Sequence, residues 1–152
     1  MQIKLHWYEP IELGSSGMLK DTLNSFDLST LPKIPALYIF YREKRSGGQE
    51  ALYIGQTTNL RKRFKEHCNN LKLVDGLENS RQGKKMFVFA EVKVKNPEKL
   101  RYALRQAERG YVQEYYPLLN EQRLEDRLDQ ITSIGDERLS ITKDDIYVFS
   151  KS

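Results

Sequence analysis

The chain has 152 residues, with 25 Lys or Arg against 21 Asp or Glu, a formal net charge of +4 and one cysteine. This length suits one ordinary domain that buries a core without a metal or disulfide staple, and a single cysteine excludes an internal disulfide. No apolar run approaches a membrane span or a signal peptide in length, so we expect no membrane association and a soluble cytoplasmic protein, nucleoid-associated or, in a eukaryote, nuclear.

The charge is unevenly distributed along the chain. Residues 41–101 contain 15 Lys or Arg against 7 Asp or Glu, whereas the rest of the chain has 10 against 14. A basic segment of this kind suits a polyanion, because each phosphate that it neutralises releases counterions. A solvated basic surface would have the same composition. The cations that we expect to contact phosphate are Arg42, Lys44, Arg45, Arg61, Lys62, Lys84 and Lys85.

The N-terminal third, residues 1–34, is expected to be scaffold that packs on the domain. Residues 1–10 alternate apolar and polar side chains, which predicts a half-buried strand. Residues 18–31 place Leu19 and Leu23 at helical spacing and predict a short helix. No residue of this segment is expected to carry chemistry.

A hairpin follows, because the triplets Leu37-Tyr38-Ile39 and Leu52-Tyr53-Ile54 read as two short strands joined by the polar loop 42–49. If the strands pair antiparallel, the two tyrosines come close on one face of the sheet. The two phenols would then lie beside the N-terminus of the next helix. Core packing is the alternative interpretation of both tyrosines. Gly55 permits either a close approach to the backbone or an unusual dihedral angle.

A helix is predicted from residue 60, with Thr58 or Asn59 as its N-cap. Arg63 and His67 lie one turn apart at the margin of its apolar face, so they can face a cleft rather than open water. The apolar stripe of this helix is expected to contain Leu60, Phe64 and Leu71.

The remaining elements are a polar connection at residues 72–85 and a third strand at residues 86–94, which the hairpin needs for a stable sheet. A long helix is predicted to begin at Asn96-Pro97 and to end before Pro117. A last strand is predicted within residues 139–149.

Glu108 lies at or beside the apolar face of that long helix, one turn from both Leu104 and Tyr111. A carboxylate in this position needs a partner, because burial of an unpaired charge is costly. A structural role is the alternative, either an ion pair with Arg105 three residues earlier or contact with the exposed side of Val112.

Residues 35–120 resemble the GIY-YIG nuclease family. The motif of that family is a Gly-apolar-Tyr triplet, then Tyr-Ile-Gly, then a helix with an arginine and often a histidine. The matching positions here are Ala36-Leu37-Tyr38, Tyr53-Ile54-Gly55, Arg63 and His67. Ala36 stands where the family has glycine.

The resemblance also implies roles for two residues further along the chain. Glu108 matches the metal-binding glutamate of the family, and Asn120 matches the asparagine of its Pro-x-x-Asn ending. The implied fold is α/β of the α+β type, with a small central antiparallel sheet of about three strands flanked by helices. We expect this nuclease-like domain at residues 35–120, with additional elements at residues 1–34 and 121–152.

The activity that the resemblance implies is a metal-dependent endonuclease, a hydrolase of DNA phosphodiester bonds. One Mg²⁺, for which Mn²⁺ can substitute, is held by Glu108. Arg63 stabilises the phosphate charge, and Tyr38 positions or activates water with help from Tyr53 and His67. Asn120 completes the catalytic set, and a homodimer is expected if the enzyme cuts both strands. A catalytically inactive module that binds nucleic acid or protein on the same fold stays the alternative.

Overall fold

The computed structural model describes residues 2–15, 17–120, 127–134 and 146–150. The strands of this part of the chain are β1 (Gln2–Trp7), β2 (Ile11–Gly14), β3 (Ala36–Glu43), β4 (Gln49–Thr57), β5 (Lys84–Lys93), β6 (Arg127–Ile134) and β7 (Ile146–Ser150). The α-helices are α1 (Leu19–Asn24), α2 (Leu60–Cys68), α3 (Leu71–Asn79) and α4 (Leu100–Tyr115), with 3₁₀ turns η1 (Leu28–Thr30) and η2 (Pro97–Lys99). These elements confirm the predicted α+β fold.

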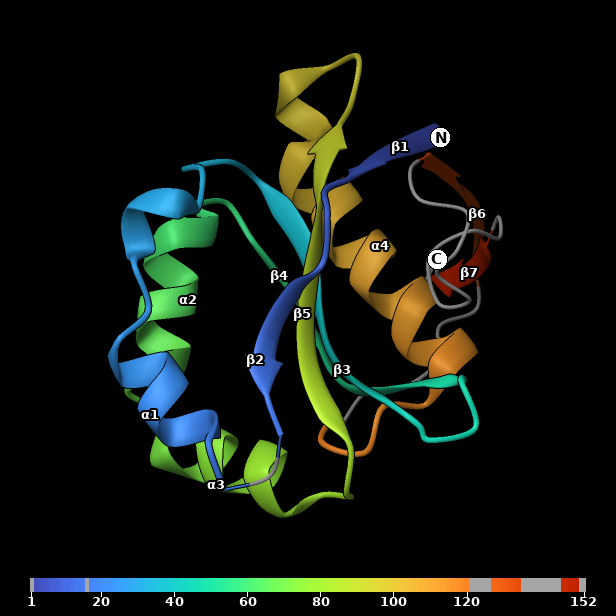
Figure 1. Cartoon of the computed structure of the whole chain (residues 1–152). Helices are drawn as coiled ribbons and strands as arrows, with labels where there is room; N and C mark the ends of the chain where they lie inside the picture. Colours follow the sequence, from blue (N-terminus) through green and yellow to red (C-terminus); the bar gives the residue numbers. More distant parts are fainter. Residues whose placement is uncertain (1, 16, 121–126, 135–145, 151–152) are drawn as a thin grey trace.

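The strands form one sheet in the order β4-β3-β5-β1-β6-β7, and β2 also pairs with β5. Its centre is the predicted antiparallel group of β4, β3 and β5, in which Tyr38 lies opposite both Gly55 and Phe89. The N-terminal strand β1 widens this group, because it pairs antiparallel with β5 and parallel with β6. The expected packing of the N-terminal segment is therefore by direct strand pairing (Figure 1).

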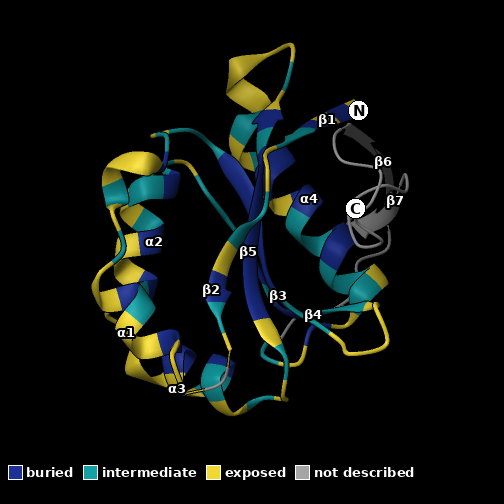
Figure 2. Cartoon of the chain, in the orientation of Figure 1, coloured by how far each residue is buried: buried dark blue, intermediate teal, exposed yellow. Residues whose placement is uncertain are grey.

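The sheet separates two layers of helices, with α1, α2 and α3 on one side and α4 on the other (Figure 1). Side chains of β3 alternate between them: Tyr38 and Phe40 join the core under α1–α3, whereas Leu37 and Ile39 join the core under α4. The outer faces of α1, α2 and α3 are exposed, and the sides that face the sheet are buried (Figure 2). Both faces of the central strands are therefore covered.

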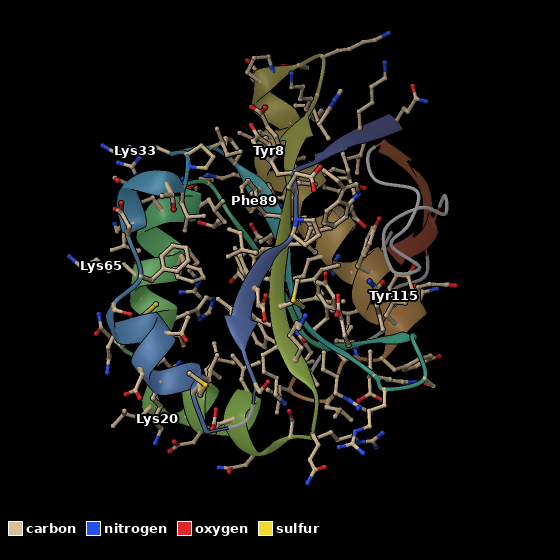
Figure 3. All side chains as sticks on the ribbon, in the orientation of Figure 1. Tyr8, Lys20, Lys33, Lys65, Phe89 and Tyr115 are labelled. Atoms are coloured by element: carbon tan, nitrogen blue, oxygen red, sulfur yellow. The ribbon has the colours of Figure 1, made fainter. Side chains whose placement is uncertain are left out.

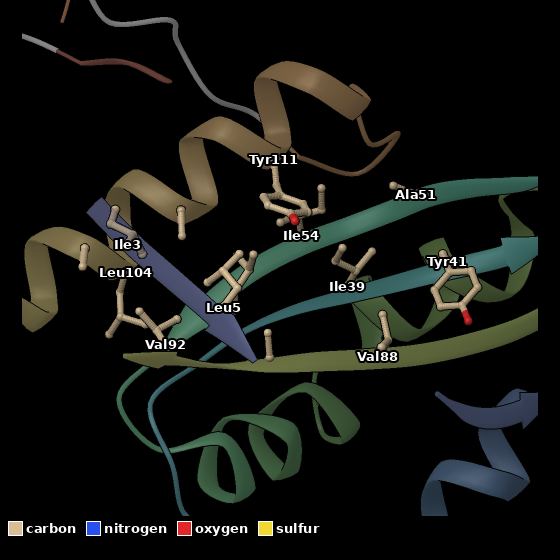
Figure 4. Packing of buried hydrophobic residues seen from close by; sticks show 14 of the residues in the cluster. Ile3, Leu5, Ile39, Tyr41, Ala51, Ile54, Val88, Val92, Leu104 and Tyr111 are labelled. Atoms are coloured by element: carbon tan, nitrogen blue, oxygen red, sulfur yellow. The ribbon is translucent and has the colours of Figure 1, made fainter. Parts of the chain in front are cut away.

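Helix α4 follows the predicted apolar pattern closely. Leu104 and Tyr111 are fully buried, and Figure 4 shows Tyr111 pointing from the helix toward Ile54 of β4. Leu100 and Tyr115 are partly buried at the two ends of the same face. This packing fixes α4 along the edge strand β4, and it thereby fixes the position of Glu108, which lies on α4.

One predicted connection is a helix, so that prediction was wrong. Residues 72–85 include most of α3, which Asn70 caps by accepting a hydrogen bond from the Leu73 N–H at 3.2 Å. The helix buries Val74 and Leu77 on one face. Leu71 was also misassigned, because it begins α3 and its side chain is 73% exposed instead of extending the stripe of α2.

The C-terminal part contains the predicted last strand as β7, residues 146–150. Residues 139–145 of that prediction lie outside the described residues. Residues 121–126, which begin the expected C-terminal extension, lie outside them too. Strand β6 was not predicted. No helix in the described part of the chain is both long and apolar enough to cross a membrane.

Two leucine truncations test the assignment of the α2 face. Leu60→Ala should lower the free energy of unfolding by about 2–5 kcal/mol, because Leu60 is fully buried against the sheet. Leu71→Ala, the same change at an exposed position, should alter it by less than about 0.5 kcal/mol. Urea unfolding of both variants measures the difference, and equal losses would contradict the assignment.

Candidate active site

The Tyr38 side chain lies directly across Gly55, its neighbour on β4. A β-carbon at residue 55 would approach the Tyr38 hydroxyl, Cζ and Cε2 atoms to less than 3.0 Å, closer than real β-carbons come. Glycine is therefore needed here for space, as the sequence suggested, and not for an unusual dihedral. The ring of Tyr38 can cross the edge strand only because residue 55 has no side chain.

Across Gly55 the Tyr38 hydroxyl meets His67, whose Nε2 atom lies 2.5 Å away. Arg63 is also a hydrogen-bond partner of the Tyr38 oxygen, and the phenol donates to His67 Nε2 in the imidazole tautomer that leaves this nitrogen unprotonated. The phenols therefore contact the middle and the last turn of α2. The expected position beside the helix N-terminus was wrong.

Helix α2 presents these two groups because its N-terminus is fixed at Asn59. The Asn59 side chain accepts a hydrogen bond from the Lys62 N–H at 3.3 Å, as predicted for an N-cap. Counting from this start, Arg63 and His67 fall on the margin that faces β3 and β4. The side chain of His67 is only 5% exposed.

Tyr53 completes a group of rings around His67. Its ring centroid lies 6.4 Å from that of Tyr38, which confirms that the two tyrosines are close on one face, and 5.4 Å from that of His67. A β-bulge shifts the register next to this pair, so that Phe40 lies opposite Tyr53 but Tyr41 lies opposite Ala51. Tyr53 is the partly exposed member of the group.

Burial decides the protonation of this group. It lowers the pKa of His67 to about 4, with the positive charge of Arg63 adding to the effect. Burial also raises the pKa of Tyr38 and of Tyr53, more than Arg63 lowers them. At neutral pH the pair of Tyr38 and His67 is thus uncharged, and the cation beside it is Arg63, whose pKa is raised by its hydrogen bond to Tyr38.

Glu108 approaches the same group from the other helical layer. It is half-buried on α4, and its negative charge adds to the burial that raises the pKa of both Tyr38 and Tyr53. The two layers meet here because β4 is the edge strand and nothing in the described sheet lies beyond it. One carboxylate therefore lies close enough to both phenols to affect their pKa.

Asn120 holds the edge of β4. Its Oδ1 atom accepts a hydrogen bond from the Ile54 N–H at 2.7 Å, and its Nδ2 group donates to the Ile54 carbonyl at 2.6 Å. The Leu119 N–H donates to the Leu52 carbonyl at 2.9 Å. The side chain of Leu119 reaches α3, where a β-carbon on Gly76 would lie 3.3 Å from it. This segment therefore fixes the backbone on both sides of Tyr53.

Ala36 is fully buried in the core beneath α1–α3, the same core that contains Tyr38. It pairs with Thr57 on one side and Glu91 on the other, and the register of β3 continues from it without interruption as far as Phe40. The methyl group that replaces the glycine hydrogen is therefore accommodated inside the core.

A polar pocket of about 420 Å³ opens beside Arg63. It is lined by residues 56–59 at the end of β4, by Lys62 on α2 and by Arg101 and Arg105 on α4. Arg101 and Arg105 were not among the predicted phosphate ligands. Their spacing of four residues, with Glu108 three residues further on, places all three near one face of α4 and was the available signal.

The seven predicted phosphate contacts separate into two groups. Lys62 and Arg61 lie on α2 near this pocket, but Arg61 donates to the Leu31 carbonyl at 2.8 Å. The other five lie at the far end of the hairpin or on the start of β5 beside it. Arg42 bonds Glu50 at 3.0 Å there, and Lys85 is buried with its ammonium group on Ser80 and the Arg81 carbonyl. The exposed members of that group are Lys44, Arg45 and Lys84.

Residues 35–122 match the family described as the GIY-YIG catalytic domain, which is more than half of the chain. The chain belongs to the GIY-YIG family. The extent of the match agrees with the resemblance seen in the sequence over residues 35–120. No curated protein and no solved structure matches the chain.

Membership in the GIY-YIG family gives the chain a nuclease-type fold, and GIY-YIG nucleases generally use divalent metal ions. The single carboxylate of Glu108 is the kind of ligand that such an ion takes. Within the described residues no group of three or more His, Cys, Asp or Glu side chains is arranged as a metal cage. A hard cation such as Mg²⁺ needs no cage, because it takes one or two carboxylates together with phosphate oxygens and water.

The buried neutral state of His67 makes the stability of the fold depend on pH. Its pKa is about 4 when folded against about 6.5 when unfolded, so between these values the unfolded chain binds a proton that the folded chain does not. The contribution of His67 to the free energy of unfolding is fully present above about pH 6.5. The free energy of unfolding should fall by about 3 kcal/mol as the pH drops to about 4. Urea unfolding at several pH values measures this loss.

The matched variant is His67→Gln, because glutamine still offers an acceptor to Tyr38 but does not titrate. Its free energy of unfolding should be lower at pH 7 but should decline less between pH 6.5 and 4 than that of the wild type. Identical pH profiles for the two proteins would show that His67 is not held neutral by burial.

Proposed function

We propose that this GIY-YIG protein is a DNA endonuclease that hydrolyses phosphodiester bonds with one divalent cation, Mg²⁺ or in its place Mn²⁺. The observation that carries the proposal is the Tyr38 hydroxyl, hydrogen-bonded to both Arg63 and His67 with Glu108 close by. Packing alone does not require a guanidinium, a neutral imidazole and a carboxylate around one phenol. Phosphodiester hydrolysis has a use for each of them.

In this mechanism Arg63 binds the phosphate. It is always cationic, its side chain is 42% exposed at the mouth of the polar pocket, and its planar fork of donors matches two nonbridging oxygens. Its ion pair with Glu66, at 2.9 Å, keeps the side chain extended along the helix. Because negative charge grows on those oxygens in the transition state, Arg63 lowers the barrier more than it strengthens substrate binding.

Proton transfer falls to the pair of Tyr38 and His67. A buried phenol with a raised pKa is a poor base by itself, so Tyr38 does not begin the reaction as a phenolate. Instead its oxygen takes a proton from the attacking water while its own proton moves to His67 Nε2, which is neutral and already in contact. The negative charge of the bound phosphate offsets the burial and the Arg63 charge that lower the pKa of His67 in the empty site. The partly exposed Tyr53 borders the path by which water reaches this oxygen.

Glu108 is the ligand for the cation. When bound there, a divalent ion would neutralise phosphate charge and stabilise the leaving oxygen. Glu108 would hold the ion from α4 while Arg63 binds the phosphate from α2, so the scissile phosphate would lie between the two helices. Asn120 acts as a positioning residue in this scheme, because both halves of its amide group hold the backbone beside Tyr53.

The test of this assignment is Glu108→Gln. The variant keeps size and hydrogen bonding but loses the charge that attracts the ion, so it should fold and bind duplex DNA yet cleave at least about 100-fold more slowly with Mg²⁺ or Mn²⁺. Cleavage of supercoiled plasmid, together with a thermal melt, gives both readouts. Glu114→Gln is the matched control, because Glu114 is exposed on the same helix and should cut at the wild-type rate. Full activity of Glu108→Gln would refute the metal role.

A further inference from the structure

The polar pocket beside Arg63 contains more positive charge than the binding of one phosphate group requires. Four basic side chains line it, Lys62 and Arg63 from α2 and Arg101 and Arg105 from α4, against the single carboxylate of Glu66. That carboxylate is already paired with Arg63. The pocket therefore has a clear excess of positive charge.

Arg101 and Arg105 are the unexplained members of this group. Both are exposed, and neither makes an ion pair or hydrogen bond with any residue in the described part of the chain. They lie four residues apart on α4, so their guanidinium groups stand on the same side of the helix, facing the start of α2. Cations gathered in this way repel each other, and an anionic ligand removes that repulsion.

A second hollow lies near the start of α4, where β1, the end of β5 and η2 meet, and the stems of its lysines make much of its lining apolar. It has a volume of about 570 Å³ and includes the side chains of Lys4, Lys93, Lys95 and Lys99. Lys99 lines this hollow and Arg101 lines the first pocket, so only the partly buried Leu100 separates the two along the chain. Lysine side chains are therefore present around η2 as well as the arginines at the first pocket.

We propose that this surface is the path of the DNA backbone. Arg101 and Arg105 bind phosphates next to the scissile one, and the lysines around η2 extend the contact along the nucleic acid. The proposal rests on the proposed nuclease function and names the side of the protein on which its substrate lies. Arg101 and Arg105 are thereby substrate-binding residues and take no part in the chemical step.

The hairpin tip, which the sequence favoured, is in the wrong place for this task. Lys44 follows Tyr38 by six residues along β3, a distance of about 20 Å at about 3.3 Å per residue. Successive phosphates of one DNA strand rise by about 3.4 Å, so a cation at the tip is about six nucleotides from the scissile bond. Lys33 and Lys65 are no better placed, since they point away from the sheet on the outer side of the α1–α2 layer (Figure 3).

Charge-matched double variants test the path. One is Arg101→Gln with Arg105→Gln, and the control is Lys44→Gln with Arg45→Gln, which removes the same charge at the opposite end of β3. Glutamine keeps the helix propensity of arginine on α4, and Lys44 and Arg45 are exposed in the hairpin loop, so both proteins should fold, and a thermal melt checks this. Binding to a short DNA duplex, and separately to one of its strands, is measured without divalent metal at about 50 to 200 mM salt.

The α4 variant should bind duplex at least about tenfold more weakly than the wild type at about 100 mM salt, and the slope of log Kd against log salt should fall by about 2. The control variant should change affinity less than about twofold. Equal losses in the two variants, or a larger loss in the hairpin variant, would overturn the proposed path. If the α4 variant lost affinity for the single strand but not for the duplex, the proposed path of duplex DNA would also be overturned.

This measurement separates the path from the proposed activity. Binding without metal involves no cleavage, so a wild type that binds through Arg101 and Arg105 but never cuts DNA supports the path and refutes the nuclease. A wild type that cuts DNA while the α4 variant binds as tightly as before refutes the path alone.

Discussion

The crossing of the Tyr38 ring over Gly55 is the contact on which the rest of the site depends. A single added methyl at residue 55 would occupy the space of the phenol, and without that space Tyr38 could not reach His67. The crossing also requires that β3 and β4 keep their register, so that these two residues lie opposite each other. The hydrogen bonds of Asn120 to Ile54 protect that register at an edge that would otherwise lack a partner strand. The contact between Tyr38 and Gly55 is thus needed both for the packing of β3 against β4 and for the position of the Tyr38 hydroxyl at His67.

The site gathers its other groups because β4 is an edge strand. Helices on opposite faces of a sheet are ordinarily kept apart by it, but beyond β4 the start of α2 and the face of α4 border one pocket. The two layers bring different charges to it. Arg63 on α2 and Glu108 on α4 act with opposite charge on the same two phenols, Tyr38 and Tyr53. This division suits a substrate that carries negative charge and also needs a cation, as a phosphodiester does.

The sequence predicted those parts of the structure that short-range patterns determine. Strand alternation gave β1 and β5, the paired Leu-Tyr-Ile triplets gave β3 and β4, helical spacing gave the core face of α4, and local capping gave Asn59 as the start of α2. It missed α3, because Gly76 and the polar residues around it resemble a loop, and the leucine that packs over Gly76 comes from far along the chain. It also missed the pocket arginines Arg101 and Arg105 and counted the buried Lys85 as a phosphate contact, since composition does not show which cations have partners in the fold.

In the proposed mechanism the buried pair of Tyr38 and His67 carries the proton of the attacking water. This step is tested most directly by single-turnover cleavage of duplex DNA with excess enzyme and Mg²⁺, comparing Tyr38→Phe with the wild type. If the pair carries this proton, Tyr38→Phe should bind DNA with unchanged affinity and cleave it about 100-fold or more slowly than the wild type. This is the usual contribution of a general acid or base. Cleavage by Tyr38→Phe at the wild-type rate would contradict this mechanism.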